Sequence, residues 1–516
     1  RDVLGSRGLG DVYKRQAVLY TKILVTMVVA LVSVPLVLKA LGASDYGLYN
    51  LVAGIIAMLS FFNNSMTVSS QRYMSVAMGE GNDNKINDIY NSSFVLHIIF
   101  ATCIVFILEV IGLPSIGKLN IDPDRIWYAN LIFQFLIIST FSKVISVPFD
   151  AIINAHEDML VFSVIELIDS FLLLVTAFVL KFIQFDKLTF YGLCIVFIAI
   201  LTLVMKLTWC LYKYKKYRLT LTKYASKSMI KEMLGFTSWN LFGGLAMMGR
   251  NQGVAVIFNI FLGTLANAAY GIANQLNGAM AQFSSTFSKA INPQLMKSEG
   301  MGDRLRLHKI SFISSKFSVL ALCLFSIPLN IEIADVLHLW LGKDIPEFTV
   351  ELSRCILVLS IVTQFSVGLM SAIQATGNIK KYQITMGLII LLNIPAAYII
   401  LKFGYPIYYV TMSFILLEVV SLIIRIFMAH NIVGISIRDF GKEVVKPCLI
   451  IVSISTVASM FPFLMIKSIW FRLIIVSIIY VMSYIILIWY IALSASQKNI
   501  VLATLAKVKD NMISKL

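Results

Sequence analysis

The sequence predicts an all-α polytopic membrane protein with about 14 transmembrane helices. Of its 516 residues, 59% are apolar and only 14% are charged, which leaves too little polar surface to cover a water-soluble globule of this length. Apolar runs of about 20 residues, the length that crosses a bilayer as a helix, recur from Ala17 almost to the C-terminus. Long continuous runs exclude a closed barrel, whose strands alternate between apolar and polar residues.

Residues 1–16 are polar and lack an initiator Met, and they share no pattern with the rest of the chain. We interpret them as a non-native tail and leave them out of the fold prediction; a genuine cytoplasmic tail is the alternative. The first six spans are then predicted near residues 17–39, 49–70, 92–113, 127–149, 160–180 and 188–211. Eight more are predicted near 234–261, 265–292, 311–331, 352–375, 382–402, 406–429, 444–465 and 469–494.

These spans divide into lobes on either side of a basic stretch. We assign residues 17–211 to an N-lobe of helices 1–6 and residues 233–430 to a C-lobe of helices 7–12, with 212–232 as a basic cytoplasmic linker. Residues 431–516 then hold helices 13–14 and a cytoplasmic tail.

The distribution of Lys and Arg predicts the orientation of the spans. The 212–232 linker carries seven basic residues, and the loop after the eighth span is also basic, so both should be cytoplasmic by the positive-inside rule. With an even number of spans, both termini are expected on the cytoplasmic side of the membrane. The net charge of +16 is accounted for by this topology signal and by attraction to an anionic leaflet, so no nucleic-acid partner is predicted.

An internal repeat relates the two halves. Residues 41–47 read Leu-Gly-Ala-Ser-Asp-Tyr-Gly, and the span that follows closes on the Gly-rich segment 79–83. The second half repeats this order with Leu262-Gly263, Tyr270-Gly271 and the segment 299–303. Because an even number of spans separates the copies, we interpret them as a parallel repeat, with the substrate path between the halves. Chance similarity of two apolar, Gly-containing segments is the alternative.

These segments resemble the Wzx-type polysaccharide flippases of the multidrug, oligosaccharidyl-lipid and polysaccharide (MATE-like) exporter superfamily, whose first two helices are joined by a Leu-Gly...Tyr-Gly element. Residues 71–74, 148–158 and 292–294 are similar to further short elements of that family. The resemblance implies two six-helix lobes in a V, two extra C-terminal helices and alternating access. It also implies a substrate, an oligosaccharide linked through diphosphate to undecaprenol, which would be translocated for surface polysaccharide biosynthesis.

A diphosphate-linked glycan requires cations and polar groups inside an apolar bundle, so charged residues within spans are the candidates for its binding. Arg250 is the strongest, because it lies inside the seventh span beside Asn251, and a guanidinium binds phosphate through two parallel hydrogen bonds. The alternative is that Arg250 pairs with a buried carboxylate. The other candidate substrate-binding residues are Arg72, Lys289, Asn274, Gln275, Gln282 and Lys22. Their structural alternatives are membrane-interface anchoring for the cations and helix–helix hydrogen bonds for the amides.

Acidic residues within spans are candidate ion-coupling sites. These are Glu166, Asp169 and Glu418; Glu418 could equally pair with Arg425, seven residues later on the same helix. No metal site and no cofactor is predicted, since neither the cysteines nor the histidines show ligand spacing and no phosphate-binding Gly-Lys loop occurs. The predicted partners are the lipid-linked oligosaccharide, membrane lipids and other polysaccharide assembly proteins.

Two other functions remain open at this stage. A multidrug cation antiporter of the same superfamily would share fold and topology, but it favours an acidic pocket, whereas the deepest charge here is Arg250. An integral-membrane enzyme of glycan assembly would need a catalytic constellation at a membrane face. The five histidines are scattered and no catalytic spacing occurs, so the sequence predicts a transporter rather than an enzyme.

Overall fold

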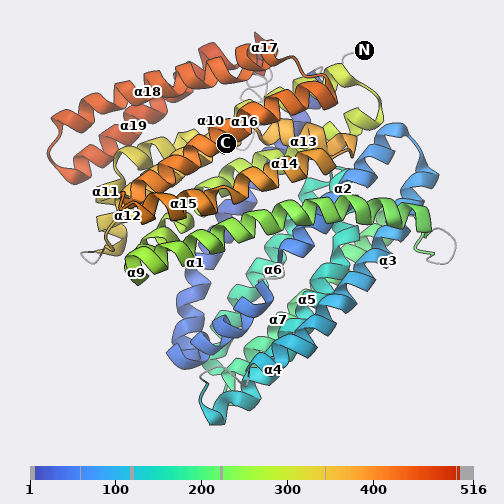
Figure 1. Cartoon of the computed structure of the whole chain (residues 1–516). Coiled ribbons are helices and arrows are strands. Elements are labelled where there is room, and N and C mark those ends of the chain that lie inside the picture. Colours follow the sequence, from blue (N-terminus) through green and yellow to red (C-terminus); the bar gives the residue numbers. More distant parts are fainter. Residues whose placement is uncertain are drawn as a thin grey trace, which may run out of the picture. The chain divides into compact units, whose positions relative to one another are not determined.

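The computed structural model describes residues 6–57, 60–116, 121–220, 225–342, 345–495, 497–499 and 502, and every regular element in these ranges is helical (Figure 1). The chain divides into two compact units. We call the first the N-unit, residues 17–244 and 296–302, and the second the C-unit, formed chiefly by residues 245–295 and 303–516.

The N-unit is built mainly from the first seven helices. They are α1 (Ser6–Ala57), α2 (Ser60–Glu80), α3 (Asp83–Ile107), α4 (Leu113–Ile116), α5 (Ile126–Ala155), α6 (Met159–Val179) and α7 (Lys187–Lys213). A π-helical turn, Leu108–Gly112, joins α3 to α4, and short 3-10 turns cover Pro123–Arg125 and Leu180–Phe182.

The long helix α9 (Lys227–Gly300) passes from the N-unit into the C-unit and back. The remaining helices are α10 (Arg304–Ile331), α11 (Ile333–Leu341), α12 (Thr349–Gln364), α13 (Val367–Thr376), α14 (Lys380–Leu391), α15 (Asn393–Lys402), α16 (Ile407–Val433), α17 (Ile437–Phe440), α18 (Lys446–Met465) and α19 (Ile469–Leu487). π-Helical turns at Gly441–Val445 and Ile488–Ala492 precede α18 and follow α19.

Glycine interrupts α1 and α9 at the two Leu-Gly positions of the repeat. Gly42 has φ 82° and Gly263 has φ 77°, values in the left-handed region where a Cβ is strained. Each of these helices therefore consists of two helical segments joined at a break. The sequence repeat is thus matched by a repeated backbone feature.

Eleven described helices are long and apolar enough to cross a membrane, or twelve if α12 and α13, bent by 44° at their junction, form one broken span. The predicted number was about fourteen, and the difference falls at two places. The candidate Lys227–Gln282 contains the Gly263 break; it covers the predicted span 234–261 and the first part, residues 265–282, of the predicted span 265–292. The predicted span 49–70 includes residues 58 and 59, which lie outside the described residues. The prediction of an all-α multi-pass membrane protein is confirmed, while fourteen spans stays a prediction.

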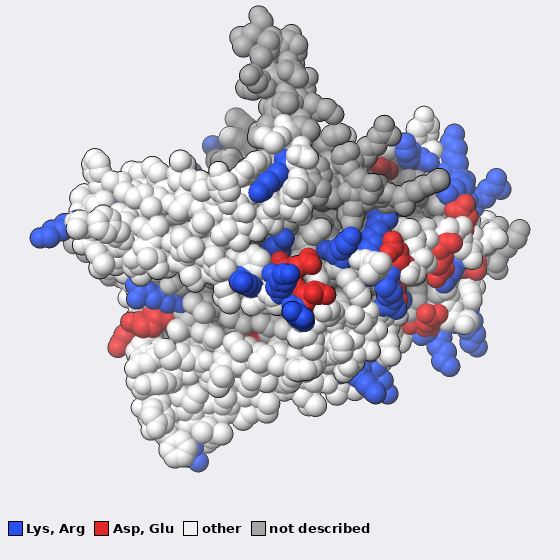
Figure 2. Space-filling model, turned by 90° about the horizontal axis from the view of Figure 1, so that it is seen from above, with Lys and Arg blue, Asp and Glu red and all other residues white. Residues whose placement is uncertain are grey.

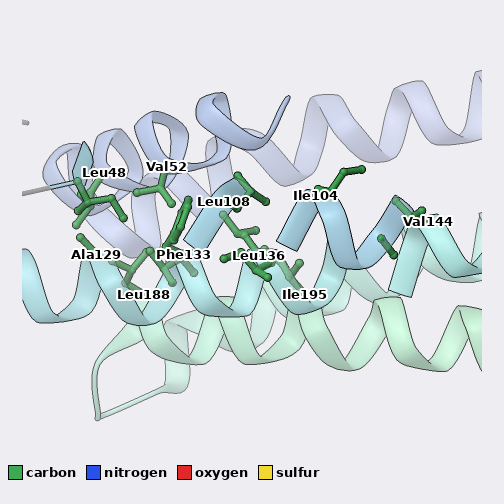
Figure 3. Close-up of a cluster of buried hydrophobic side chains, with 14 residues drawn as sticks. Leu48, Val52, Ile104, Leu108, Ala129, Phe133, Leu136, Val144, Leu188 and Ile195 are labelled. Atoms are coloured by element: carbon green, nitrogen blue, oxygen red, sulfur yellow. The ribbon is translucent and has the colours of Figure 1, made fainter. Parts of the chain in front are cut away.

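Close packing of small against large residues builds the core of the N-unit. Leu48, Phe133 and Leu188 belong to one buried cluster to which α1, α3, α5 and α7 contribute (Figure 3). An added Cβ on Gly112 would lie 2.6 Å from the Phe133 ring, and one on Gly192 would lie 2.4 Å from a neighbouring Ile side chain. Because lipid offers apolar groups no less favourable surroundings than the protein interior, such close approach is what holds membrane helices together.

Hydrogen bonds attach α19 and the π-helical turn after it to α10. The hydroxyls of Tyr480 and Tyr484 donate to carbonyls of α10, at 3.1 and 2.9 Å. The ammonium of Lys316 donates to the carbonyl of Ala492 at 2.9 Å, where it meets the negative end of the α19 helix. The predicted helices 13 and 14 are thus packed against the rest of the C-unit.

The surface is largely apolar, as expected for helices in contact with lipid. Large side chains such as Phe461, Leu464 and Trp470 are 65–79% exposed. On the face seen in Figure 2, Lys, Arg, Asp and Glu gather in limited patches and wide areas carry no charge. Such a surface is stable in a bilayer, where exposed apolar groups cost nothing.

Candidate functional site

The N-unit contains a cavity of about 310 Å³ with a polar and charged wall. The lining residues come from α2, α5, α6 and α7; they are Asn63, Thr67, Lys143, Ser146, Val147, Asp150, Ile165, Glu166, Asp169, Ala199, Thr202 and Lys206. Three of these helices, α5, α6 and α7, lie in candidate membrane spans. The cavity therefore gathers five ionisable side chains among membrane helices, where each charge is costly without a partner.

Helix α5 presents a cation and an acid to the cavity. Lys143 and Asp150 are seven residues apart, two helical turns, and so lie on one face of α5. Between them Pro148 lacks the N–H that continues the helical ladder, and the hydroxyl of Ser146 donates to the Lys143 carbonyl at 2.8 Å. The irregular turn thus lies beside the charged groups.

Two ion pairs neutralise most of the charge in and beside the cavity wall. The ammonium of Lys206, from α7, lies 2.8 and 2.9 Å from the two carboxylate oxygens of Asp150, and both side chains are largely buried. Beside the cavity, Lys22 of α1 reaches Glu166 of α6 at 2.7 Å and lies over the ring of Phe162. Lys22, predicted as a substrate-binding residue, and Glu166, predicted as an ion-coupling residue, are thus brought together by the fold.

The third acid of the cavity, Asp169, is placed differently. It is half-buried on α6, one turn from Glu166, and no Lys or Arg among the described residues lies within ion-pair distance of it. Lys143 likewise has no carboxylate that close among those residues. Of the three acids in the wall, Asp169 is the one that forms no ion pair with a described lysine.

In the C-unit, Arg250 contacts its neighbour Asn251. The Arg250 Nε and Nη2 donate to the side-chain oxygen of Asn251 at 3.1 and 2.9 Å, and both residues are half-buried. No carboxylate in the described part of the chain lies within ion-pair distance of Arg250. The Gly249 and Gly253 positions of the same helix pack against side chains of α14 and α15, so Arg250 stands beside that contact. The predicted alternative, a pair with a buried carboxylate, is not what the structure shows.

The remaining predicted substrate-binding residues are dispersed along the chain. Arg72 is buried within α2 of the N-unit, where its guanidinium stacks on the rings of Tyr73 and Phe236, 4.5 and 5.1 Å from their centroids. The Asn274 amide donates to the carbonyl one turn earlier in α9. Three further residues of α9 are exposed; these are Gln275, Gln282 and Lys289.

Glu418 lies in a buried polar cluster of the C-unit. Its carboxylate accepts from Arg425 Nη1 at 2.7 Å, two turns later on α16, and both side chains are about nine-tenths buried. Arg425 also donates to the hydroxyl of Ser366 at 2.6 Å. The spacing of seven residues in the sequence had suggested this Glu418–Arg425 pair as the alternative to an ion-coupling role for Glu418.

A helix crossing closes one end of the N-unit. An added Cβ on Gly79 of α2 would lie 2.1 Å from the carbonyl oxygen of Lys297, and one on Gly300 would lie 2.0 Å from the carbonyl oxygen of Val76. The two contacts are reciprocal, because each glycine lies against the carbonyl of the residue three positions before the other glycine. Each also stands two residues before a glycine with positive φ, Gly81 after Gly79 and Gly302 after Gly300, in equivalent turns of the repeat. The end of α9 and the end of α2 therefore cross with their backbones in direct contact.

Polar groups surround this crossing. The Lys297 ammonium donates to Glu157 at 2.6 Å. The adjacent His156 ring stacks on Tyr214, with centroids 4.3 Å apart, and the Tyr214 hydroxyl donates to Asp158. Burial, followed by the positive charge of Lys297, lowers the pKa of His156 to about 4, so its imidazole is neutral at physiological pH.

Comparison with solved structures places this arrangement of helices among known folds. A MATE protein in complex with MaL6 has a TM-score of 0.72 over 83% of this chain and 97% of its own, at 13% identity. A MOP superfamily transporter from Pyrococcus furiosus, described as having a binding pocket of reverse polarity, gives 0.72 over 83% and 96%, at 14% identity. An outward-facing multidrug resistance MATE transporter of that superfamily gives 0.70 over 82% and 95%, at 14% identity. The chain has the MATE fold.

No family model and no curated protein matches the sequence. Two of the compared proteins are described as transporters of the MOP superfamily. At this level of identity the likeness shows the fold alone, and the predicted Wzx-type assignment within it stays a prediction.

Sequence reasoning missed three residues that the MATE fold brings to the charged cavity. Lys143 and Lys206 lie inside apolar spans, and Asp150 follows one, so a search for every charge within or next to a span would have found them. Their pairing could not be found in this way, because Lys206 and Asp150 are 56 residues apart.

Proposed function

We propose that this protein is a flippase that moves undecaprenyl-diphosphate-linked oligosaccharide repeat units across the bacterial inner membrane by alternating access. The more general part of this proposal, that the chain has the fold of MOP superfamily transporters, is supported by the arrangement of its helices. The substrate rests on the charges within the membrane helices.

The observation that carries the proposal is the pairing of acids with lysines in the N-unit cavity. A transporter of organic cations needs carboxylates that are free to meet the positive charge of its cargo. Here Asp150 is held by Lys206 and Glu166 by Lys22. Because most of the acidic charge is neutralised inside the protein, the cavity offers little attraction to a cation.

The unpaired cations favour an anionic cargo. Arg250 and Lys143 have no carboxylate within ion-pair distance among the described residues, so each can bind a phosphate oxygen without breaking an existing pair. A guanidinium suits a diphosphate best, because its parallel N–H groups match two oxygens. One of the solved MATE folds is itself described as having a pocket of reverse polarity, which supports the view that this fold accepts pockets of either sign.

Asp169 supplies the coupling step in this proposal. Its carboxylate can exchange a proton or a small cation, and the charge of the cavity then changes by one unit while both lysine pairs stay intact. In surroundings of low dielectric constant a change of one charge strongly alters the free energy of neighbouring ionic groups. We expect Asp169→Asn to slow transport and to remove its dependence on the ion gradient.

The experiment is translocation of a labelled undecaprenyl-diphosphate oligosaccharide in proteoliposomes. We expect the intact protein to flip the lipid and Arg250→Ala, inserted at equal amounts and equally stable, to lose most of that activity. Gln252→Ala is the matched control, since this exposed neighbour lies on the same helix and carries no charge. Failure of the intact protein with several glycans, combined with export of a cationic dye, would replace this proposal by the multidrug antiporter.

A further inference from the structure

The segment that follows α7 makes a turn, closed by the Tyr217 N–H on the Tyr214 carbonyl at 2.9 Å, and then runs along α3 through residues 218–220. The Asn87 side chain accepts from the Arg218 backbone N–H at 3.0 Å and donates to the Lys216 carbonyl at 3.4 Å. The Asn91 side chain repeats this contact, donating to the Arg218 carbonyl at 2.9 Å and accepting from the Thr220 N–H at 2.8 Å. One helical turn between the asparagines, about 6 Å, matches the length of two extended residues, about 6.6 Å.

This asparagine ladder fixes the depth of the segment relative to the membrane. Asn87 and Asn91 lie in the first turns of α3, whose candidate membrane span begins at Asp83. The segment itself begins where the candidate span of α7 ends, at Lys213. Its backbone therefore runs beside the ends of two candidate membrane spans, where we expect lipid headgroups.

The side chains of this segment form an exposed cationic surface, which we define as Lys213, Lys215 and Arg218. All three are exposed, and none has an acidic partner in the described ranges. Their neighbour Lys216 differs, since it pairs with Asp83 at 2.8 Å. From residue 187 to residue 231 the sequence contains no Asp or Glu, so no local acid offsets these charges.

We propose that Lys213, Lys215 and Arg218 form a docking surface for the headgroups of anionic phospholipids. Each phosphodiester carries one negative charge, and the guanidinium of Arg218 can bind two of its oxygens. Tyr212, 72% exposed just before the surface, is the kind of amphipathic side chain that lies at a membrane interface. Because the asparagine ladder already orders the backbone, lipid binding need not order the segment, which lowers the entropic cost.

The test measures the selectivity of the full-length protein for spin-labelled phosphatidylglycerol over phosphatidylcholine in nanodiscs. We expect a preference for phosphatidylglycerol in the intact protein and a loss of roughly tenfold or more when the surface cations are changed together to Gln, from the attraction of each cation near the surface. The matched control changes Lys39, Lys181 and Lys402, three exposed cations elsewhere in the chain, to Gln and should retain the preference. Equal loss in the control, or no loss in the first variant, would overturn the proposal.

A second variant tests whether the ladder positions the cations. Replacing Asn87 and Asn91 together by Ala keeps every charge but frees the backbone, and we expect it to weaken the preference. An unchanged preference in this variant would overturn the positioning role.

A third measurement is competition by inorganic phosphate at constant ionic strength. Displacement of the labelled lipid would indicate a site for free phosphate and refute the lipid surface.

Discussion

Replacement of Gly79 by Ala tests the backbone contact between the ends of α2 and α9. The new Cβ would lie 2.1 Å from the Lys297 carbonyl oxygen and 2.9 Å from its carbon. Since non-bonded carbon contacts are most favourable near 3.5 Å or more, the two helices must separate by about 1 Å or distort. The neighbouring Lys297–Glu157 pair, closed at 2.6 Å, would be strained by the same movement.

The expected magnitude combines two opposing terms. Overpacking at a contact of this kind costs about 1–3 kcal/mol. Ala is favoured over Gly within a helix by about 1 kcal/mol, which offsets part of that cost. We therefore expect Gly79→Ala to destabilise the protein by about 1 kcal/mol, and by no more than about 2 kcal/mol. Gly300→Ala should behave alike, because its Cβ would lie 2.0 Å from the Val76 carbonyl oxygen.

Thermal unfolding in detergent, followed by intrinsic fluorescence, measures the change. Gly235→Ala is the matched control: it lies on α9 in the N-unit and an added Cβ there meets nothing within 4 Å, so we expect a small gain in stability. The double variant at Gly79 and Gly300 should cost less than the sum of the single changes, since one separation of the helices accommodates both methyl groups. A Gly79→Ala protein as stable as the Gly235→Ala control would refute the reasoning.

Three further predictions concern charged groups. Lys206→Met should destabilise the protein by about 3 kcal/mol because it leaves Asp150 buried without its partner, and adding Asp150→Asn should restore much of that loss; a double-mutant cycle in thermal unfolding checks both. His156→Phe should flatten the pH dependence of stability: with its pKa lowered to about 4, the imidazole contributes stability above about pH 6.5 that is lost as the pH falls toward 4, and equal slopes for both proteins would contradict this. Arg472→Met should lower the unfolding temperature markedly, because it leaves the buried carboxylate of Glu332 without its partner; an unchanged temperature would show that the ion pair adds nothing.

The helical fold could be predicted because each membrane helix is formed by one continuous stretch of sequence. The apolar runs predicted the spans, and the two Leu-Gly elements marked positions where the backbone breaks, Gly42 and Gly263. The Glu418–Arg425 pair could also be anticipated, since both residues lie on one helix face at a spacing of seven. These features are local, so periodicity suffices to find them.

The charged cavity depends on contacts that periodicity does not encode. Lys22 and Glu166 are 144 residues apart, and each lies alone in an apolar segment, where a lysine can equally extend toward the membrane surface. Only the packing of α1 against α6 shows that Lys22 forms an ion pair with Glu166 instead of extending toward the membrane surface. The same holds for the exposed amides of α9, since a polar residue on a membrane helix can face a cavity, a neighbouring helix or water.

The path of α9 has a mechanical consequence. The helix belongs to the N-unit up to Gly244, to the C-unit from residue 245 to 295, and to the N-unit again from residue 296. A displacement of one unit against the other would therefore load α9 at these two transitions, one in each of the segments that the Gly263 break separates. At the first place stand two consecutive glycines, and close to the second stands Pro293, residues that weaken the helical ladder. The chain thus has compliant joints at both transitions, and stiffening either one, with alanine for glycine or for proline, would raise the elastic cost of moving the units.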